Sequence, residues 1–155
     1  HKGHLAISKE AKRRFKLEKI IWAVTKKNPL KAESKTPISK KIKDCKKIIG
    51  MNSFIKVKFY ENIIKSNKTI DLINYLKKDK KIEIFFLMGA DNLINFHKWF
   101  RSKLISQKCN IIVFDRHGYK KNSLKSKTFK RLNNKTLTFV EFKKVNISSS
   151  QLRKI

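Results

Sequence analysis

The sequence predicts an α/β fold in which one parallel sheet carries helices on both faces. Segments with a helical apolar period alternate with short strand-like runs along all 155 residues, at the spacing of β–α–β units. Only four Gly and two Pro punctuate the chain, and no Gly- or Ser-rich linker divides it. We therefore expect a single domain that spans residues 1–155.

The first half of the chain predicts two helices and two strands. Ile7, Ala11 and Phe15 recur every fourth residue, which is typical of one apolar face of a helix. A second helix begins at Pro37 and ends at Gly50, because proline suits the first helical position and glycine the end. The segments in order are a helix over 4–17, a strand over 19–24, a polar loop over 25–36, a helix over 37–50 and a strand over 54–59.

The second half repeats this alternation, and its strands are followed by polar clusters. Ligands of parallel α/β sheets bind beyond the carboxyl ends of the strands, so these clusters are candidate site residues. The segments in order are a helix over 69–79, a strand over 82–88, a short helix from Asp91, a strand over 109–114, a strand over 136–142 and the start of a helix over 148–155.

The formal net charge of +29 favours phosphorylated ligands. The excess is spread over the whole chain, and 34 of its 40 cations are Lys, whereas base-edge recognition favours Arg. We therefore expect small phosphorylated substrates and no dedicated nucleic-acid partner.

Apolar runs are far shorter than the ~18 residues of a membrane-spanning helix. Two cysteines, Cys45 and Cys109, cannot form a disulfide framework or a four-cysteine zinc site, and no secretory signal is visible. We expect a cytoplasmic protein with no membrane partner. The sequence leaves the oligomeric state open.

Two histidines, His1 and His4, flank Gly3 in an H-x-G-H motif at the start of the first helix. Residues three apart on a helix lie on the same side. The helix start adds free N–H groups and the positive end of the dipole, which suit a phosphate, and glycine permits its close approach. A metal site is the alternative, and it would need ligands brought by folding, with His97 and His117 as candidates.

Two other polar clusters stand where a helix is expected to begin. Ser148 and Ser149 offer hydroxyl and N–H donors, and Arg153 lies about one turn further on, able to fork a phosphate. A plain capping box with a surface arginine explains them equally well. Asp91, two residues after Gly89, either caps its helix or accepts a ribose hydroxyl.

Trp99 lies between Lys98 and the pair Phe100–Arg101. It is either a core residue or a half-exposed platform on which a flat ring stacks.

Together and in this order, these motifs resemble the H-x-G-H nucleotidyltransferase superfamily, and more narrowly the bacterial nicotinate-nucleotide adenylyltransferases. H-x-G-H and I-S-S-S/T-x-x-R are shared by several adenylyltransferases, whereas M-G-A-D-N-L-x-x-F-H-K-W at 88–99 is specific to the nicotinate-nucleotide branch. Residues 22–31 (WAVTKKNPLK), 68–72 (KTIDL) and 114–119 (FDRHGY) fit the same branch. The resemblance covers nearly the whole chain and implies a Rossmann-like sheet.

The resemblance implies adenylyl transfer from ATP to nicotinate mononucleotide, which yields nicotinate adenine dinucleotide and pyrophosphate in NAD biosynthesis. The nucleotide phosphate would attack the α-phosphorus of ATP directly, and Mg²⁺ would accompany ATP rather than occupy a protein metal site. The implied roles are catalysis by His1, His4, Lys31 and Arg153; ATP binding by Gly3, Gly89, Asp91, Arg116, Ser148 and Ser149; and binding of the nicotinate nucleotide by Thr69, Trp99 and Phe100, with Trp99 stacked on the pyridine ring.

The sequence departs from the family pattern in three places. The G-G-x-F-D-P segment and the strand that carries it are missing before His1, and the chain stops soon after Arg153, where members continue with a helix. Asn28-Pro29-Leu30 stands where many members have Pro-Pro-His. We therefore expect the first strand and the C-terminal helix to be truncated. The alternatives are a sister adenylyltransferase acting on nicotinamide mononucleotide or phosphopantetheine, and a non-catalytic basic protein that binds nucleic acid.

Overall fold

The computed structural model describes residues 1–27 and 35–142. These residues fall into two compact units, one within His1–Asn67 and one within Lys68–Asn146. Lys31, Ser148, Ser149 and Arg153 lie outside the described residues, as does the Asn28-Pro29-Leu30 segment. The single domain over 1–155 stays a prediction.

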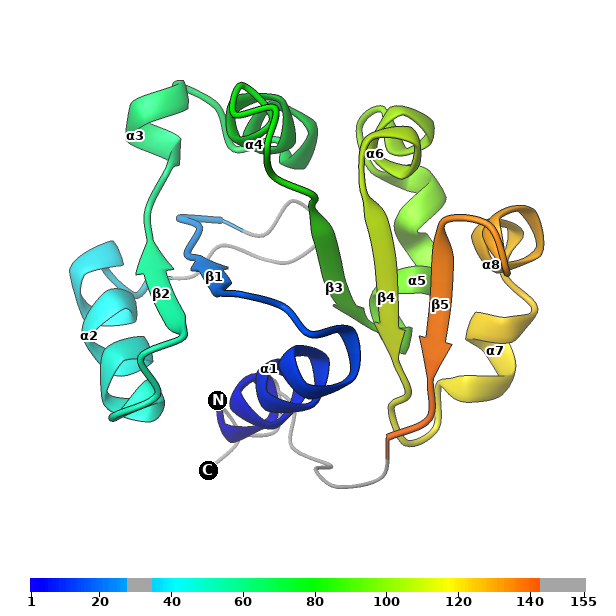
Figure 1. Ribbon diagram of the computed structural model, residues 1–155, viewed down its shortest axis with the longest axis horizontal. Coiled ribbons are helices and arrows are strands. Elements are labelled where there is room, and N and C mark those ends of the chain that lie inside the picture. Colours follow the sequence, from blue (N-terminus) through cyan, green and yellow to red (C-terminus); the bar gives the residue numbers. More distant parts are fainter. Residues whose placement is uncertain (28–34, 143–155) are drawn as a thin grey trace. The chain divides into compact units, whose positions relative to one another are not determined.

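The first unit is a pair of parallel strands with helices, as the sequence predicts (Figure 1). Ile20 pairs with Ile55 and Ala23 with Lys58 at the two ends of the strand pair. The elements in order are α1 (Lys2–Phe15), β1 (Ile20–Ala23), α2 (Ile38–Ile49), β2 (Ile55–Lys58) and α3 (Glu61–Ile64).

Helix α1 begins two residues earlier than predicted, and this places the histidine motif within the helix. His1 is the N-cap, and the His4 N–H donates to the His1 carbonyl oxygen at 2.9 Å. At the other end, Lys16 adopts a left-handed conformation with φ 51°, and its N–H bonds to the Lys12 carbonyl. The helix thus stops before Leu17, which was predicted to belong to it.

The second unit is a three-stranded parallel sheet in the order β3-β4-β5, with helices between successive strands (Figure 1). Gly89 at the end of β3 lies beside Phe114 at the end of β4, so the two carboxyl ends coincide. The elements in order are α4 (Thr69–Leu76), β3 (Phe85–Gly89), α5 (Ala90–Asn95), η1 (Phe96–Lys98), α6 (Ser102–Lys108), β4 (Asn110–Phe114), α7 (Lys120–Leu124), α8 (Lys127–Leu132) and β5 (Leu137–Val140).

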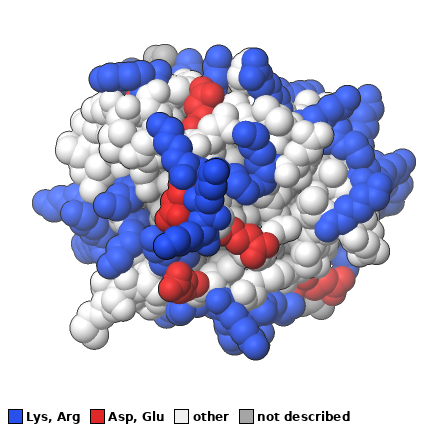
Figure 2. Space-filling model, turned by 45° about the horizontal axis from the view of Figure 1, so that its top comes forward, with Lys and Arg blue, Asp and Glu red and all other residues white. Residues whose placement is uncertain are grey.

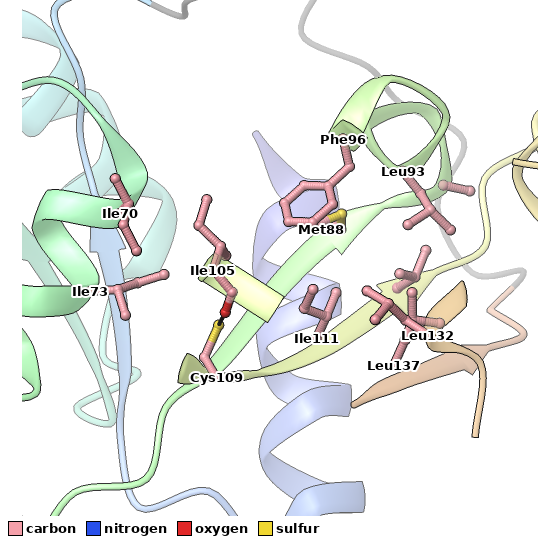
Figure 3. Packing of buried hydrophobic residues seen from close by; sticks show 12 residues of the cluster. Ile70, Ile73, Met88, Leu93, Phe96, Ile105, Cys109, Ile111, Leu132 and Leu137 are labelled. Atoms are coloured by element: carbon pink, nitrogen blue, oxygen red, sulfur yellow. Dashed lines mark hydrogen bonds between the residues drawn. The ribbon is translucent and has the colours of Figure 1, made fainter. Parts of the chain in front are cut away.

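The core of the second unit lies on the sheet and under α4, α5 and α6. Ile111 in β4 and Leu93 in α5 are fully buried, and Phe96 lies over Met88 (Figure 3). The Cys109 thiol donates to the Ile105 carbonyl at 3.1 Å, which satisfies a buried polar group within this cluster. The core therefore fixes the point where β3 passes into α5, next to the predicted Gly89–Asp91 cluster.

Every strand pair in the described residues is parallel, as predicted, but several element boundaries differ from the predictions. The strand predicted over 82–88 spans Phe85–Gly89, and the one predicted over 136–142 spans Leu137–Val140. Helices α3, α6, α7 and α8 have four to seven residues and were not predicted. Such short segments carry too few apolar repeats to show a helical period.

Candidate active site

The two histidines of the first unit form a stacked pair at the start of α1. Their ring centroids are 4.0 Å apart and the planes differ by 20°. The His1 Nδ1 atom is buried and has no hydrogen-bond partner among the described residues. A buried polar atom without a partner is costly, so this ring is a ready partner for a ligand. Gly3 between them is buried in α1.

Trp22 from β1 supports this pair, a role that the sequence analysis missed. Its ring centroid is 5.9 Å from that of His4, with the planes at 73°. The indole Nε1–H donates to the Ser8 hydroxyl at 2.9 Å, and Ser8 is only 2% exposed. Ser8 lies one helical turn after His4 on the same side of α1. The hydrogen bond from Trp22 to Ser8 therefore holds the indole against His4. In the sequence, the four-residue spacing of His4 and Ser8 was the one feature that could have indicated this contact.

The segment that follows β1 is anchored from α2 and α3. Lys41 Nζ donates to the carbonyl oxygens of Thr25 at 3.1 Å and Lys26 at 2.8 Å. The Lys26 N–H donates to a Glu61 carboxylate oxygen at 3.2 Å. These contacts fix the backbone of the chain that leads toward Lys31, itself outside the described residues.

In the second unit, the carboxyl ends of β3 and β4 bring together two predicted ATP-binding residues. Arg116 Nη1 lies 2.6 Å from Asp91 Oδ2, and the two side chains are 29% and 19% exposed. The other oxygen, Asp91 Oδ1, is buried without a hydrogen-bond partner in the part of the chain that the structure describes. A carboxylate held by one cation, with one oxygen unused, can accept a hydroxyl hydrogen from a ligand.

Gly89 is required beside this carboxylate. A Cβ atom at Gly89 would lie 2.5 Å from Asp91 Oδ1. The glycine has φ −82° and ψ 155°, which any residue can adopt, so the constraint is steric and not conformational. Glycine therefore leaves the space that the Asp91 carboxylate fills.

Trp99 combines the two interpretations that the sequence left open. It is partly buried and packs on the core, with its ring centroid 5.3 Å from that of Phe96 and 5.9 Å from that of Phe86. Its indole Nε1 is buried with no hydrogen-bond partner within residues 1–27 and 35–142. Its stacking on a pyridine ring stays a prediction.

Phe100, by contrast, is 51% exposed, and Thr69 is the first residue of α4. Lys68 Nζ lies 4.1 Å from the centre of the Phe100 ring, and Arg101 Cζ lies 5.2 Å from it. Thr69 and Phe100 are thus neighbours through Lys68, although 30 residues separate them in the chain. The sequence analysis did not name either cation as a site residue.

The described residues show dispersed positive charge (Figure 2) and no cluster of metal-ligating side chains. Lys and Arg side chains are spread over the visible face in Figure 2 and do not gather into one stripe. Within the described ranges, no three His, Cys, Asp or Glu side chains come together as a metal site. Nor does any helix in those ranges have the length and apolar character needed to cross a membrane.

The chain belongs to the cytidylyltransferase-like family, whose model matches residues 1–155. A protein of Pelagibacter ubique named "Probable nicotinate-nucleotide adenylyltransferase" is 66% identical over 155 residues, which are 100% of this chain and 86% of that protein. A protein of the same name from Methylorubrum extorquens (strain PA1) is 33% identical over 121 residues, 77% of this chain and 65% of its own length.

A solved structure shows the same fold. The nicotinic acid mononucleotide adenylyltransferase of Plasmodium falciparum, complexed with NaAD, superposes with a TM-score of 0.73 and 18% identity. The match covers 99% of this chain and 76% of that one. The predicted Rossmann-like α/β class is therefore confirmed.

Proposed function

We propose that this chain transfers the adenylyl group of ATP to nicotinate mononucleotide. A phosphate oxygen of the mononucleotide attacks the α-phosphorus, and the bond from that phosphorus to the β-phosphate oxygen breaks. The products are nicotinate adenine dinucleotide and pyrophosphate, so the reaction is a step of NAD biosynthesis. The observation that carries the proposal is the stacked pair His1–His4 at the start of α1, in a chain 66% identical to a protein of that name.

The histidine pair suits the charge that develops on a transferring phosphoryl group. In-line displacement needs little covalent chemistry from the protein, so catalysis rests on positioning and on preorganised donors. His1 and His4 would donate to the phosphate oxygens at the N-terminal end of α1, where the helix dipole also favours negative charge. Lys31, Ser148, Ser149 and Arg153 are proposed to hold the remaining phosphates, on the strength of the family motifs alone.

The other substrate contacts belong to residues of the second unit. Asp91 is proposed to accept a ribose hydroxyl through its unused Oδ1, while Arg116 holds the other carboxylate oxygen. Trp99 would stack on the pyridine ring, and backbone N–H groups at Thr69 and Phe100 would bind the nicotinate carboxylate.

We further propose that Mg²⁺ enters with ATP, held mainly by phosphate oxygens and water. The side chains proposed to face the phosphates are imidazoles, hydroxyls and cations. Such groups suit phosphate oxygens better than a hard divalent cation. We place the reaction in the cytoplasm, where ATP is at hand.

The proposal is tested by following pyrophosphate release and dinucleotide formation with the full chain. Nicotinate mononucleotide should be turned over, whereas nicotinamide mononucleotide and phosphopantetheine should be poorer substrates. His4→Ala should lower kcat by about 10²-fold, the scale for one lost charge-stabilising donor. Lys9→Ala removes a cation from the same helix and serves as the matched control. Equal or better turnover of the amidated nucleotide would defeat the acid-specific assignment, and unchanged turnover in His4→Ala would remove that residue from the mechanism.

A further inference from the structure

One exposed aromatic ring of the second unit is flanked by two cations. Phe100 is 51% exposed, with Lys68 Nζ at 4.1 Å and Arg101 Cζ at 5.2 Å from its ring centre. Both cations therefore lie against the same ring. An aromatic face attracts cations at this distance, so the ring holds both charges at one place.

Arg101 occupies this place at a conformational cost. It has φ 53° and ψ 41°, the left-handed region that side chains other than Gly and Asn seldom adopt. Lys16 and Lys65 share such angles, but both are helix C-caps, where the conformation is common. Arg101 is an N-cap, where an extended backbone is usual. Helix capping therefore does not account for the strain at Arg101, and strain of this kind gathers at ligand sites.

The start of α4 adds to the positive potential. Lys68 is the N-cap residue of α4, immediately before Thr69, and its side chain makes no cap hydrogen bond. The first N–H groups and the helix dipole therefore favour an anion there. Asp71 is the one acidic residue in the first turn, so the two cations outnumber it.

We propose that Lys68 and Arg101 determine the preference for a pyridine nucleotide that bears a carboxylate over one that bears a carboxamide. The inference rests on the proposed function, which brings the nicotinate group to Thr69 and Phe100. A carboxylate and a carboxamide have nearly the same shape, so shape alone cannot separate them. A carboxylate gains attraction from both cations, whereas a carboxamide, which has no net charge, gains little.

The same cations also limit where the carboxylate can lie. The guanidinium of Arg101 can fork two carboxylate oxygens, and the ammonium of Lys68 acts as a point charge. Lys68 and Arg101 are both exposed, and the Phe100 ring attracts the charged end of each. Phe100 thus acts through the cations as a positioning residue.

The test compares the ratio of kcat/KM for nicotinate mononucleotide to kcat/KM for nicotinamide mononucleotide, in the full chain. Lys68→Gln and Arg101→Gln should each lower this ratio about tenfold, the scale of one charged hydrogen bond. The loss should fall on the acid substrate, while kcat/KM for the amide stays unchanged. Lys78→Gln is the matched control, because Lys78 Nζ lies 5.4 Å from the Tyr75 ring at the far end of the same helix. That control should keep the wild-type ratio.

Arg101→Gly separates specificity from structure. Glycine adopts the left-handed conformation without cost, so the variant should unfold at the same temperature as wild type or higher. The acid-to-amide ratio should nevertheless fall as far as in Arg101→Gln. If the role of Arg101 were merely structural, Arg101→Gly would keep the wild-type acid-to-amide ratio and unfold at a lower temperature.

The outcomes distinguish a failure of the proposed function from a failure of this inference. If wild type forms no dinucleotide from either substrate, the proposed function fails, and this inference fails with it. If wild type prefers the acid while Lys68→Gln and Arg101→Gln keep that preference, the proposed function stands and this inference is overturned.

Discussion

Replacement of Gly89 by alanine tests whether the Asp91 carboxylate is held in one position. The new Cβ would lie 2.5 Å from Asp91 Oδ1 and 3.7 Å from its Cγ. The backbone at Gly89 needs no change, because φ −82° suits alanine. The carboxylate must therefore turn away, and its 2.6 Å contact with Arg116 is lost or weakened.

The size of the effect follows from three contributions. An off-rotamer aspartate costs about 0.5–1.5 kcal/mol. A charged hydrogen bond contributes about 1.5–3 kcal/mol, and we take the lower end because water screens a pair that is 29% and 19% exposed. Replacing glycine by alanine lowers the conformational entropy of the unfolded chain, which stabilises the folded state by about 0.4–1 kcal/mol. We therefore expect a loss of about 1–2 kcal/mol in the free energy of unfolding.

For activity, the same variant should raise KM for ATP about tenfold with little change in kcat, as expected when uniform binding is lost. Urea unfolding and initial rates measure the two effects. The control is the same substitution in an Asp91→Ala background, where no carboxylate oxygen is left to be displaced. If Gly89→Ala costs as much stability in that background as in wild type, the displacement of Asp91 is not the cause and the reasoning is refuted.

Three further predictions concern packing, thiol reactivity and pH. Phe96 is fully buried, so Phe96→Ala should lower the free energy of unfolding by about 3–5 kcal/mol in urea titrations; a loss below 1 kcal/mol would contradict the described core. Burial raises the pKa of the Cys109 thiol to about 11 and also raises that of Cys45, which is only partly buried, so a thiol reagent at pH 8 should label Cys45 first, with the rates converging in urea. Hydrogen bonds from two arginines lower the pKa of Glu10 to about 2, so its contribution to stability is present above pH 4.5 and lost as pH falls through 2; the difference in Tm between wild type and Glu10→Gln should shrink over that range.

The sequence predicted the parallel strands better than the helices between them. Residues 111–114 (IIVF) are an unbroken apolar run, as expected of a strand buried on both faces, and β4 spans Asn110–Phe114. Helix α8 is different, because it is held by tertiary packing and by the Ser126 hydroxyl, which accepts from the Phe129 N–H at 3.1 Å. A cap of that kind is common in turns as well, so residue type alone could not identify a helix of six residues.

The candidate site was predictable where it depends on strand order. Asp91 and Arg116 follow successive strands of a parallel sheet, and the topology alone places their backbones at one edge. That the two side chains would pair, and leave one carboxylate oxygen unused, depends on rotamers that no sequence pattern specifies. Trp22 was predicted as part of a strand and of the family segment over 22–31, but not as a support of His4, which its indole contacts edge to face.

The two cations beside Phe100 show why charge could not be assigned to function from composition. A chain with a net charge of +29 has a lysine near almost any surface position, so neither Lys68 nor Lys78 stands out in the sequence. Both lie over an aromatic ring, at 4.1 Å and 5.4 Å, and they flank the two ends of α4. At Phe100 there is a second cation, Arg101, and its backbone is left-handed. A left-handed residue is visible in a sequence only when it is Gly or Asn, and Arg101 gives no such signal. The strain at Arg101 is thus information that only the folded chain contains, and it is the observation that distinguishes a specificity site from one more solvated lysine.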